Sequence, residues 1–160
     1  MRDTNKHAIP VNGRAPGVRS VEVRTSLTQV HSQMALIPEA KRNVAVLGAS
    51  QKPDRHSNQA VRLLASFDYR PIPVNPAFDE IEGLPCFPTL GEIGERVHTV
   101  TLYLRAERST PLIDEILAAS PQRIIMNPGA ENEQLAAAAS GAGIEVVEGC
   151  TLVMLRTGLF

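Results

Sequence analysis

The stretch that most constrains the fold covers residues 43–59 and reads NVAVLGASQKPDRHSNQ. Residues 44–47 form a continuous apolar run, which is typical of a short strand buried on both faces. Gly48 ends the run, and the small residues Ala49 and Ser50 let the backbone approach a ligand closely. The stretch therefore predicts a buried strand with a small-residue turn at its carboxyl end.

Cationic side chains follow this turn directly. Lys52, Arg55 and His56 come within a few residues, and Ser57 or Asn58 is expected to cap a helix that ends near residue 67. A helix N-terminus offers free N–H groups and the positive end of a dipole. Together these features predict a site for a phosphate or diphosphate. The plainer alternative is a glycine needed only for the turn, followed by a solvated charged loop.

Length and composition restrict the class of protein. With 160 residues, the chain is long enough for one sizeable core. Its 16 basic and 17 acidic residues nearly cancel, which argues against a nucleic-acid partner. No apolar run approaches the ~20 residues of a membrane span. The two cysteines, Cys86 and Cys150, indicate neither a disulfide framework nor a zinc site, so a cytoplasmic location is the default.

The amino-terminal part differs from the rest in charge. Residues 1–42 hold seven of the basic residues and three of the acidic ones. Residues 1–25 combine this charge with proline and glycine and show little periodicity, so we expect a flexible basic arm. Residues 26–160 are expected to form a single domain, which starts with a short helix at 26–37 where apolar residues recur at helical spacing.

Further short apolar runs continue the alternation of strands and helices. Strands are expected at Pro71–Val74, Val100–Leu104, Ile124–Met126 and Ile144–Val147. Alternating strands and helices predict a Rossmann-like, doubly wound parallel sheet of about five strands in a three-layer α/β/α arrangement.

Two of the connecting helices carry end signals. Ser109 is expected to cap a helix that has Pro111 in its first turn. A later helix is expected from about Glu131 to Ser140, with Gly141 at its C′ position.

In sheets of this kind, ligands bind beyond the carboxyl ends of the strands. The candidate binding residues share that position. They are Gly48, Ala49 and Ser50 after the first strand, Asn75 and Pro76 after the second, Arg105 after the third, Asn127, Pro128 and Gly129 after the fourth, and Glu148 and Cys150 after the fifth. Ordinary turn chemistry explains each Asn-Pro pair taken alone. Their shared edge favours one binding site, completed by Lys52, Arg55, His56, Ser57 and Asn58.

The type of nucleotide follows from what these ends contain. The G-x-G-x-x-G fingerprint is absent, since the next glycine after Gly48 is Gly83. A NAD site also has an acid at the end of the second strand, where this chain has Asn75. The pattern suits a nucleotide with a diphosphate and a phosphorylated ribose, such as coenzyme A. NADP stays open, because Lys52 or Arg55 could hold a 2′-phosphate.

Three segments resemble a known family. They are GASQKPDRHSNQAVRLL, PIPVNPAFDEIEGLPCFPTLGEI and NPGAENEQLAAAASGAGIEVVEGCTLVML. These resemble the small stand-alone coenzyme A-binding proteins, which are similar to the nucleotide-binding domain of the succinyl-CoA synthetase α subunit. The resemblance covers about residues 40–155 and implies a Rossmann-like fold that binds coenzyme A or an acyl-CoA. Many relatives have a Gln-containing loop where this chain has Asn127-Pro128-Gly129, and the basic arm lies outside the family pattern.

No catalytic set is evident. A succinyl-CoA synthetase reaction needs a phosphorylated histidine on a following domain, and His56 fits a ligand contact or cap better than a nucleophile. We therefore expect a non-catalytic carrier, sensor or partner module that holds no metal. The apolar carboxyl-terminal residues 151–160 favour a homodimer, because such a surface is usually covered. The alternatives are an NAD(P)-binding oxidoreductase or redox sensor, and an interaction protein without a ligand. Cys150 is expected to be a buried, inert thiol, or else to form a mixed disulfide with the ligand's thiol under oxidation.

Overall fold

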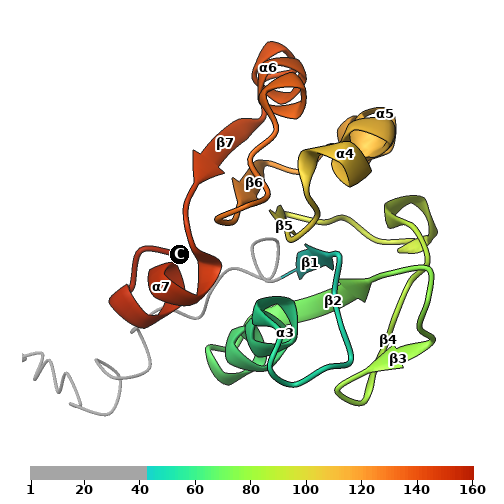
Figure 1. The fold of residues 1–160 in the computed structure, drawn as a ribbon, viewed down its shortest axis with the longest axis vertical. Coiled ribbons are helices and arrows are strands. Elements are labelled where there is room, and N and C mark those ends of the chain that lie inside the picture. Colours follow the sequence, from blue (N-terminus) through green and yellow to red (C-terminus); the bar gives the residue numbers. More distant parts are fainter. Residues whose placement is uncertain (1–42) are drawn as a thin grey trace, which may run out of the picture. The chain divides into compact units, whose positions relative to one another are not determined.

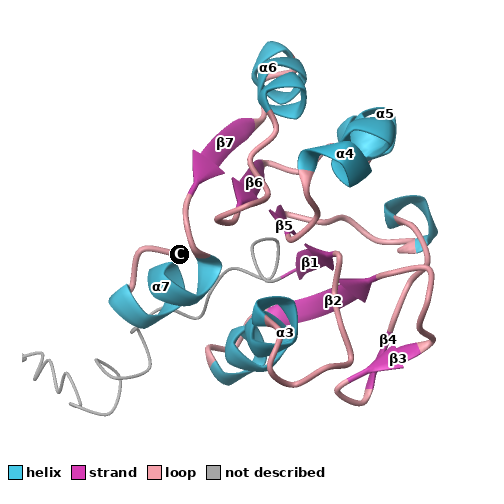
Figure 2. Ribbon diagram, viewed as in Figure 1, coloured by secondary structure: helices cyan, strands magenta, loops and turns pink. Residues whose placement is uncertain are grey.

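The computed structural model describes residues 43–160, so the expected arm and the expected helix at 26–37 lie outside the described residues. Five parallel strands form one sheet in the order β2-β1-β5-β6-β7 (Figures 1 and 2). They are β1 (Asn43–Leu47), β2 (Arg70–Val74), β5 (Thr99–Leu102), β6 (Arg123–Met126) and β7 (Glu145–Glu148). The predicted Rossmann-like α/β sheet of about five strands is thus confirmed.

Helices cover both faces of this sheet (Figure 2). One face carries α3 (His56–Ser66) and α7 (Thr151–Thr157), and the other carries α4 (Ala106–Ser109), α5 (Ile113–Ala118) and α6 (Glu133–Gly141). The smaller elements are the hairpin of β3 (Glu80–Ile81) and β4 (Leu84–Pro85) and the 3₁₀ turns η1 (Leu90–Glu92) and η2 (Thr110–Leu112). Within residues 43–160, no helix is long and apolar enough to cross a membrane.

Alternating side chains of β1 supply the two cores. Val44 and Val46 pack with Leu64 of α3, whereas Ala45 and Leu47 belong to the core on the other face. Because successive side chains point to opposite faces, an all-apolar strand fits only where both faces are covered. The chain runs from β1 to β2 on one side and then crosses back to β5 on the other. The connections therefore diverge between β1 and β5, which creates a crevice at the carboxyl ends of these strands.

The edge strand β2 has two prolines at its outward-facing positions. The carbonyl of Val74 accepts from Gly48 N–H at 3.0 Å and so faces β1, whereas the carbonyl of Pro73 accepts from Phe87 N–H at 3.0 Å on the outer side. By alternation, Pro71 also faces outward. Proline has no N–H, so neither position presents a free donor to a further strand. This edge is thereby protected from pairing with another chain.

Helix α3 begins earlier than expected, and the predicted cap at Ser57 or Asn58 is wrong. Its N-cap residue is Arg55, which makes no side-chain capping bond. Asn58 lies within the first turn, where its amide donates to the carbonyl of Ser50 and to the carboxylate of Glu82. The asparagine serves tertiary contacts here, and a local propensity for caps does not reveal them.

The predicted cap at Ser109 is also wrong, because β5 ends at Leu102 and the next helix starts at Ala106. Ser109 is the last residue of α4 and is fully buried, with its hydroxyl accepting from Asn132 Nδ2 at 2.8 Å. Pro111 falls in the 3₁₀ turn η2, which separates α4 from α5.

Both ends of α6 lie two residues away from the predicted positions or use a different capping residue. Asn132 is its N-cap and accepts from Leu135 N–H at 3.1 Å, so the helix starts at Glu133 rather than Glu131. Gly141 is its last helical residue, and the C′ position belongs to Gly143, which has a φ of 76°. Either glycine could occupy the C′ position of a helix. The hydrogen bond from Ile144 N–H to the Ala139 carbonyl places Gly143 there.

Candidate functional site

The loop between β1 and α3, residues 48–55, has its carbonyl groups turned back onto α3. The carbonyl of Ser50 accepts from Asn58 Nδ2 at 2.9 Å, and that of Pro53 accepts from Arg62 Nη2 at 2.8 Å. Gln59 Nε2 bonds the carbonyl of Asp54 at 3.1 Å. Three side chains of one helix thus occupy the acceptors of the loop. These three carbonyls are therefore directed at α3 and away from the outer side of the loop.

Several backbone donors of the same segment have no partner within the described residues. Within residues 43–160, the N–H groups of Ser50, Gln51 and Asp54 make no hydrogen bond, and α3 has neither a side-chain cap nor an acid in its first turn. The side chains of Lys52 and Arg55 are exposed and form no ion pair within the described part of the chain. Free N–H groups, the N-terminus of a helix and two cations form the chemistry of an anion site.

Gly48 is fixed by two independent constraints. Its φ is +89°, a conformation that side chains on Cβ disfavour, and a Cβ there would lie 2.8 Å from Leu104 Cδ2. The loop therefore leaves β1 in direct contact with the residues that follow β5. Only glycine meets both requirements.

Asn75 connects this loop to the end of β2. Its Nδ2 donates to the carbonyl of Ala49 at 2.7 Å, and its Oδ1 accepts from Ala77 N–H at 2.9 Å. Because both groups of the amide are engaged within the protein, Asn75 holds two loops together instead of presenting an acceptor to a ribose diol. The sequence places Asn75 correctly at the strand end but does not show which way its amide points.

A pocket of about 500 Å³ opens at the carboxyl ends of β1 and β2, where Gly48 is one of its lining residues. We call it the switch-point pocket. Its walls are mostly apolar, with Leu47, Val74, Leu104 and Leu112 among the lining residues, and Asn75 and Pro76 lie on its β2 side. Since Gly48 belongs both to the loop and to the pocket, the two form one continuous site.

Two charged lining residues of this pocket were missed by sequence reasoning. Arg108 and Glu115 are the charged groups of the pocket, whereas the predicted Arg105 is the exposed N-cap of α4 and does not line it. The expected strand extended to Leu104, which put Arg105 at its end. Because β5 stops at Leu102, the chain enters α4 earlier and Arg108 reaches the pocket one turn further on.

The predicted residues after β6 lie along the same edge but outside the pocket. Asn127 is 3% exposed, and its amide donates to Thr101 Oγ1 and the carbonyl of Leu102 while accepting from Thr151 N–H. Pro128 and Gly129 are exposed. Asn127 therefore ties β6, β5 and α7 together, in the same manner in which Asn75 ties β2 to β1.

Beyond β7, Cys150 is half-buried, carries a free thiol and is the N-cap residue of the seven-residue helix α7.

Nearby, the hydroxyl of Tyr103 is buried and makes no hydrogen bond within the described residues. Burial raises the pKa of Tyr103 to about 12, and the neighbouring hydroxyl of Thr151 opposes this shift only in part. Tyr103 is thus a neutral phenol at physiological pH and not a candidate base.

Cys86 is the more enclosed of the two cysteines. It is 8% exposed, and its Sγ lies 3.5 Å from the carbonyl of Asn75. Burial raises the pKa of this thiol, which the hydrogen bond to Asn75 partly offsets and the negative charge of Asp79 reinforces. Cys86 therefore packs in the core behind the carboxyl end of β2.

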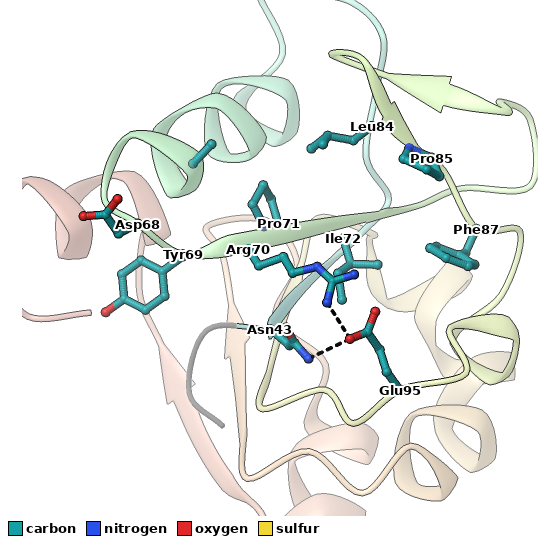
Figure 3. A pocket seen from close by; sticks show the side chains of 11 residues that line it. Asn43, Asp68, Tyr69, Arg70, Pro71, Ile72, Leu84, Pro85, Phe87 and Glu95 are labelled. Atoms are coloured by element: carbon teal, nitrogen blue, oxygen red, sulfur yellow. Dashed lines mark hydrogen bonds and ion pairs between the residues drawn. The ribbon is translucent and has the colours of Figure 1, made fainter. Parts of the chain in front are cut away.

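A second pocket of about 610 Å³ lies at the opposite, amino end of β2 (Figure 3). Arg70 and Asn43 both point toward Glu95, at Nη1–Oε2 and Nδ2–Oε2 distances of 2.6 and 3.2 Å. Its polar groups are thus largely paired with each other. None of the candidate binding residues lines this pocket, which keeps the candidate site at the carboxyl edge.

Residues 42–156 match the model of a protein family described as a CoA binding domain. This chain belongs to the CoA-binding domain family. The match spans the loop, both Asn-Pro segments and Cys150, and so confirms the resemblance seen in the sequence. A nucleotide-type small molecule is accordingly the class of ligand that this CoA-binding domain is built for.

Individual relatives agree with this placement. The CoA-binding domain is 30% identical over 98 residues to the uncharacterized protein YneT of Bacillus subtilis, covering 61% of this chain and 73% of YneT. It is 32% identical over 72 residues to the ADP-forming acetate–CoA ligase I of Archaeoglobus fulgidus, covering 45% of this chain and 10% of the ligase. A crystal structure of an uncharacterized protein superposes with a TM-score of 0.67 at 37% identity, covering 75% of this chain and 98% of that protein.

Proposed function

We propose that the chain binds coenzyme A or an acyl-CoA at the loop of residues 48–55 and in the adjoining switch-point pocket. The observation that carries this proposal is the orientation of the loop. The carbonyls of Ser50, Pro53 and Asp54 are bonded to side chains of α3, while the N–H groups of Ser50, Gln51 and Asp54 make no hydrogen bond within residues 43–160. The side chains of Lys52 and Arg55 form no ion pair within the same residues. An anionic ligand with several oxygens satisfies all of these donors at once.

The two halves of the site match the two halves of the nucleotide. The diphosphate suits the free N–H groups and the start of α3, where negative charge is favoured. The adenine ring suits the apolar walls of the switch-point pocket, whose volume of about 500 Å³ is ample for it. Gly48 belongs to both the loop and the pocket, so the ribose between the diphosphate and the adenine would lie beside it.

The remaining candidate residues define a path for the pantetheine arm. Arg105, Pro128, Gly129 and Cys150 follow successive strands from β5 to β7, and neighbouring strands lie about 4.8 Å apart. From β1 to β7 the edge therefore extends about 14 Å. Asn127 contributes by holding this edge in shape, because its own amide is fully engaged.

A thermal-shift and calorimetric screen tests the proposal with coenzyme A, acetyl-CoA, NAD, NADP and ATP. We expect the two coenzyme A ligands to stabilise the fold, by about 2.7 kcal/mol at 100 times their dissociation constant. Stabilisation by NADP in preference to coenzyme A would replace this proposal with the NAD(P) alternative. A chain that responds to none of the ligands would instead support an interaction protein without a nucleotide.

We propose a non-catalytic role as carrier, sensor or partner module. The region described holds no histidine or acid placed as a reacting group in the switch-point pocket apart from Glu115, whose Oε1 accepts from Leu90 N–H at 2.6 Å. Incubation with acetyl-CoA, ADP and phosphate should therefore yield no ATP above the protein-free background. ATP formed in proportion to protein concentration would contradict the proposal.

We also propose that the protein is a cytoplasmic homodimer. Val153 of α7 and Leu159 are 53% and 73% exposed, so the carboxyl-terminal segment leaves apolar surface uncovered. Light scattering at micromolar concentration should give twice the monomer mass, and Val153→Glu should shift it to the monomer. A monomer mass for the unmodified chain would remove the proposed dimer, and fractionation of cells tests the location.

A further inference from the structure

The switch-point pocket contains one cation that the diphosphate loop does not use. Arg108 is the only Lys or Arg among its described lining residues, and it makes no ion pair within residues 43–160. Glu115, which also lines the pocket, is held through its Oε1 to Leu90 N–H. The guanidinium of Arg108 is therefore available to a ligand in the pocket.

The backbone that carries Arg108 is firmly anchored. Its own N–H donates to the carbonyl of Arg105 at 2.9 Å. The next residue, Ser109, is fully buried and accepts a hydrogen bond from Asn132 Nδ2, which also bonds Thr110 Oγ1 at 3.1 Å. Because Asn132 is the N-cap of α6, the short helix α4 is tied to its neighbour. Such anchoring fixes the backbone position from which the side chain of Arg108 extends.

Arg108 and the loop cations lie on different parts of the site. Lys52 and Arg55 precede α3, whereas Arg108 belongs to α4 on the other face of the sheet, and Gly48 lies where the loop joins the pocket. A nucleotide with its diphosphate on the loop and its ring in the pocket has its ribose near Gly48. A phosphate attached to that ribose is then the group that meets Arg108 and not the loop.

We infer that Arg108 binds the 3′-phosphate of coenzyme A and makes the chain selective for coenzyme A over its 3′-dephospho form; this inference rests on the proposed function. A guanidinium is suited to this task because it forms two parallel charge-assisted hydrogen bonds to phosphate oxygens. The end of β2 supports the same selectivity. The Oδ1 of Asn75 already accepts from Ala77 N–H, so it is a weaker acceptor for a ribose diol than a free carboxylate would be.

The test is calorimetric titration of the full chain and of Arg108→Gln with coenzyme A and with dephospho-coenzyme A. The unmodified chain should bind coenzyme A about tenfold more tightly, the usual worth of one charge-assisted contact at an exposed site. Arg108→Gln should bind both ligands equally, with its affinity for dephospho-coenzyme A unchanged. Arg96→Gln, which removes an exposed arginine outside the switch-point pocket, should keep the tenfold preference.

The outcomes separate this inference from the proposed function. If the unmodified chain binds both ligands with equal affinity, or if Arg108→Gln keeps the preference, Arg108 does not bind the 3′-phosphate, while coenzyme A binding itself stands. An equal loss for both ligands in Arg108→Gln also overturns the inference, because it indicates a general effect on the pocket. If the unmodified chain binds neither ligand, the proposed function fails.

Discussion

The side-chain amide of Asn75 donates a hydrogen bond of 2.7 Å to the backbone carbonyl of Ala49 and so joins the end of β2 to the loop after β1. This bond crosses between the two strands whose carboxyl ends form the switch-point pocket. It also turns a carbonyl of the loop away from the anion site. Asn75 therefore shapes the site through the backbone.

Asn75→Asp tests this relationship. The substitution keeps the shape of the side chain but replaces the donor by a carboxylate oxygen that faces a carbonyl. We expect the free energy of unfolding to fall by about 1–3 kcal/mol and the affinity for coenzyme A to fall with it. Urea denaturation and calorimetry measure the two effects. Gln134→Glu, which adds the same charge at an exposed position of α6, should change neither by much, and equal behaviour of both variants would contradict the role of Asn75.

Gly48→Ala should be strongly destabilising, since the new Cβ would both occupy a φ of +89° and lie 2.8 Å from Leu104 Cδ2. Adding the backbone and steric costs gives about 2–4 kcal/mol. Thermal and urea denaturation report the loss. Combining Gly48→Ala with Leu104→Ala should cost less than the sum of the two single changes, because the clash is removed while the backbone strain stays.

Gly141→Ala provides the matched control for Gly48. This glycine is helical and has open space around a Cβ, so alanine there should stabilise α6 by up to about 1 kcal/mol. Similar losses in both variants would show that the effect at Gly48 is not specific to its position.

Arg55→Ala should weaken coenzyme A binding by about 1.5–3 kcal/mol, the range for hydrogen bonds to charged groups. The effect should shrink as salt is raised, because the side chain is exposed and its charge is screened. Titration calorimetry at two salt concentrations measures it, with Arg96→Ala as a comparison on the same fold. An unchanged dissociation constant would exclude Arg55 from the site.

The buried phenol of Tyr103 should make the free energy of unfolding fall at alkaline pH. Its pKa is raised by burial to about 12 in the folded chain, against 10 for the free side chain. Above pH 10 the unfolded chain loses a proton that the folded chain retains, so stability is complete below pH 10 and falls as the pH rises toward 12. The slope from this residue is about 1.4 kcal/mol per pH unit.

Tyr103→Phe separates this contribution from other alkaline effects. The phenol makes no hydrogen bond within the described residues, so its removal should leave stability at pH 8 nearly unchanged. At pH 11 the variant should be more stable than the unmodified chain. Equal urea midpoints at pH 11 would show that Tyr103 ionises as readily when folded as when unfolded.

Much of the architecture could be read from local sequence. The apolar run of residues 44–47 and the shorter runs after it predicted the five strands, because strands of a parallel sheet covered on both faces are mostly apolar. Helix ends were less accessible. Asn58 and Ser109 carry cap-forming side chains, yet each is used in a contact with a residue distant in the chain, Glu82 and Asn132 respectively.

The sequence alone determined the fold class, the family and the strand ends that line the candidate site, because hydrophobic periodicity and turn chemistry are local properties. Only the tertiary structure decided which side chains face the ligand. It turned the amides of Asn75 and Asn127 inward to join loops, bonded the carbonyls of residues 50, 53 and 54 to α3, and placed Arg108 rather than Arg105 at the pocket. The physical reason is that a hydrogen-bonding group has several possible partners, and the choice between them depends on segments that come together only in the folded chain.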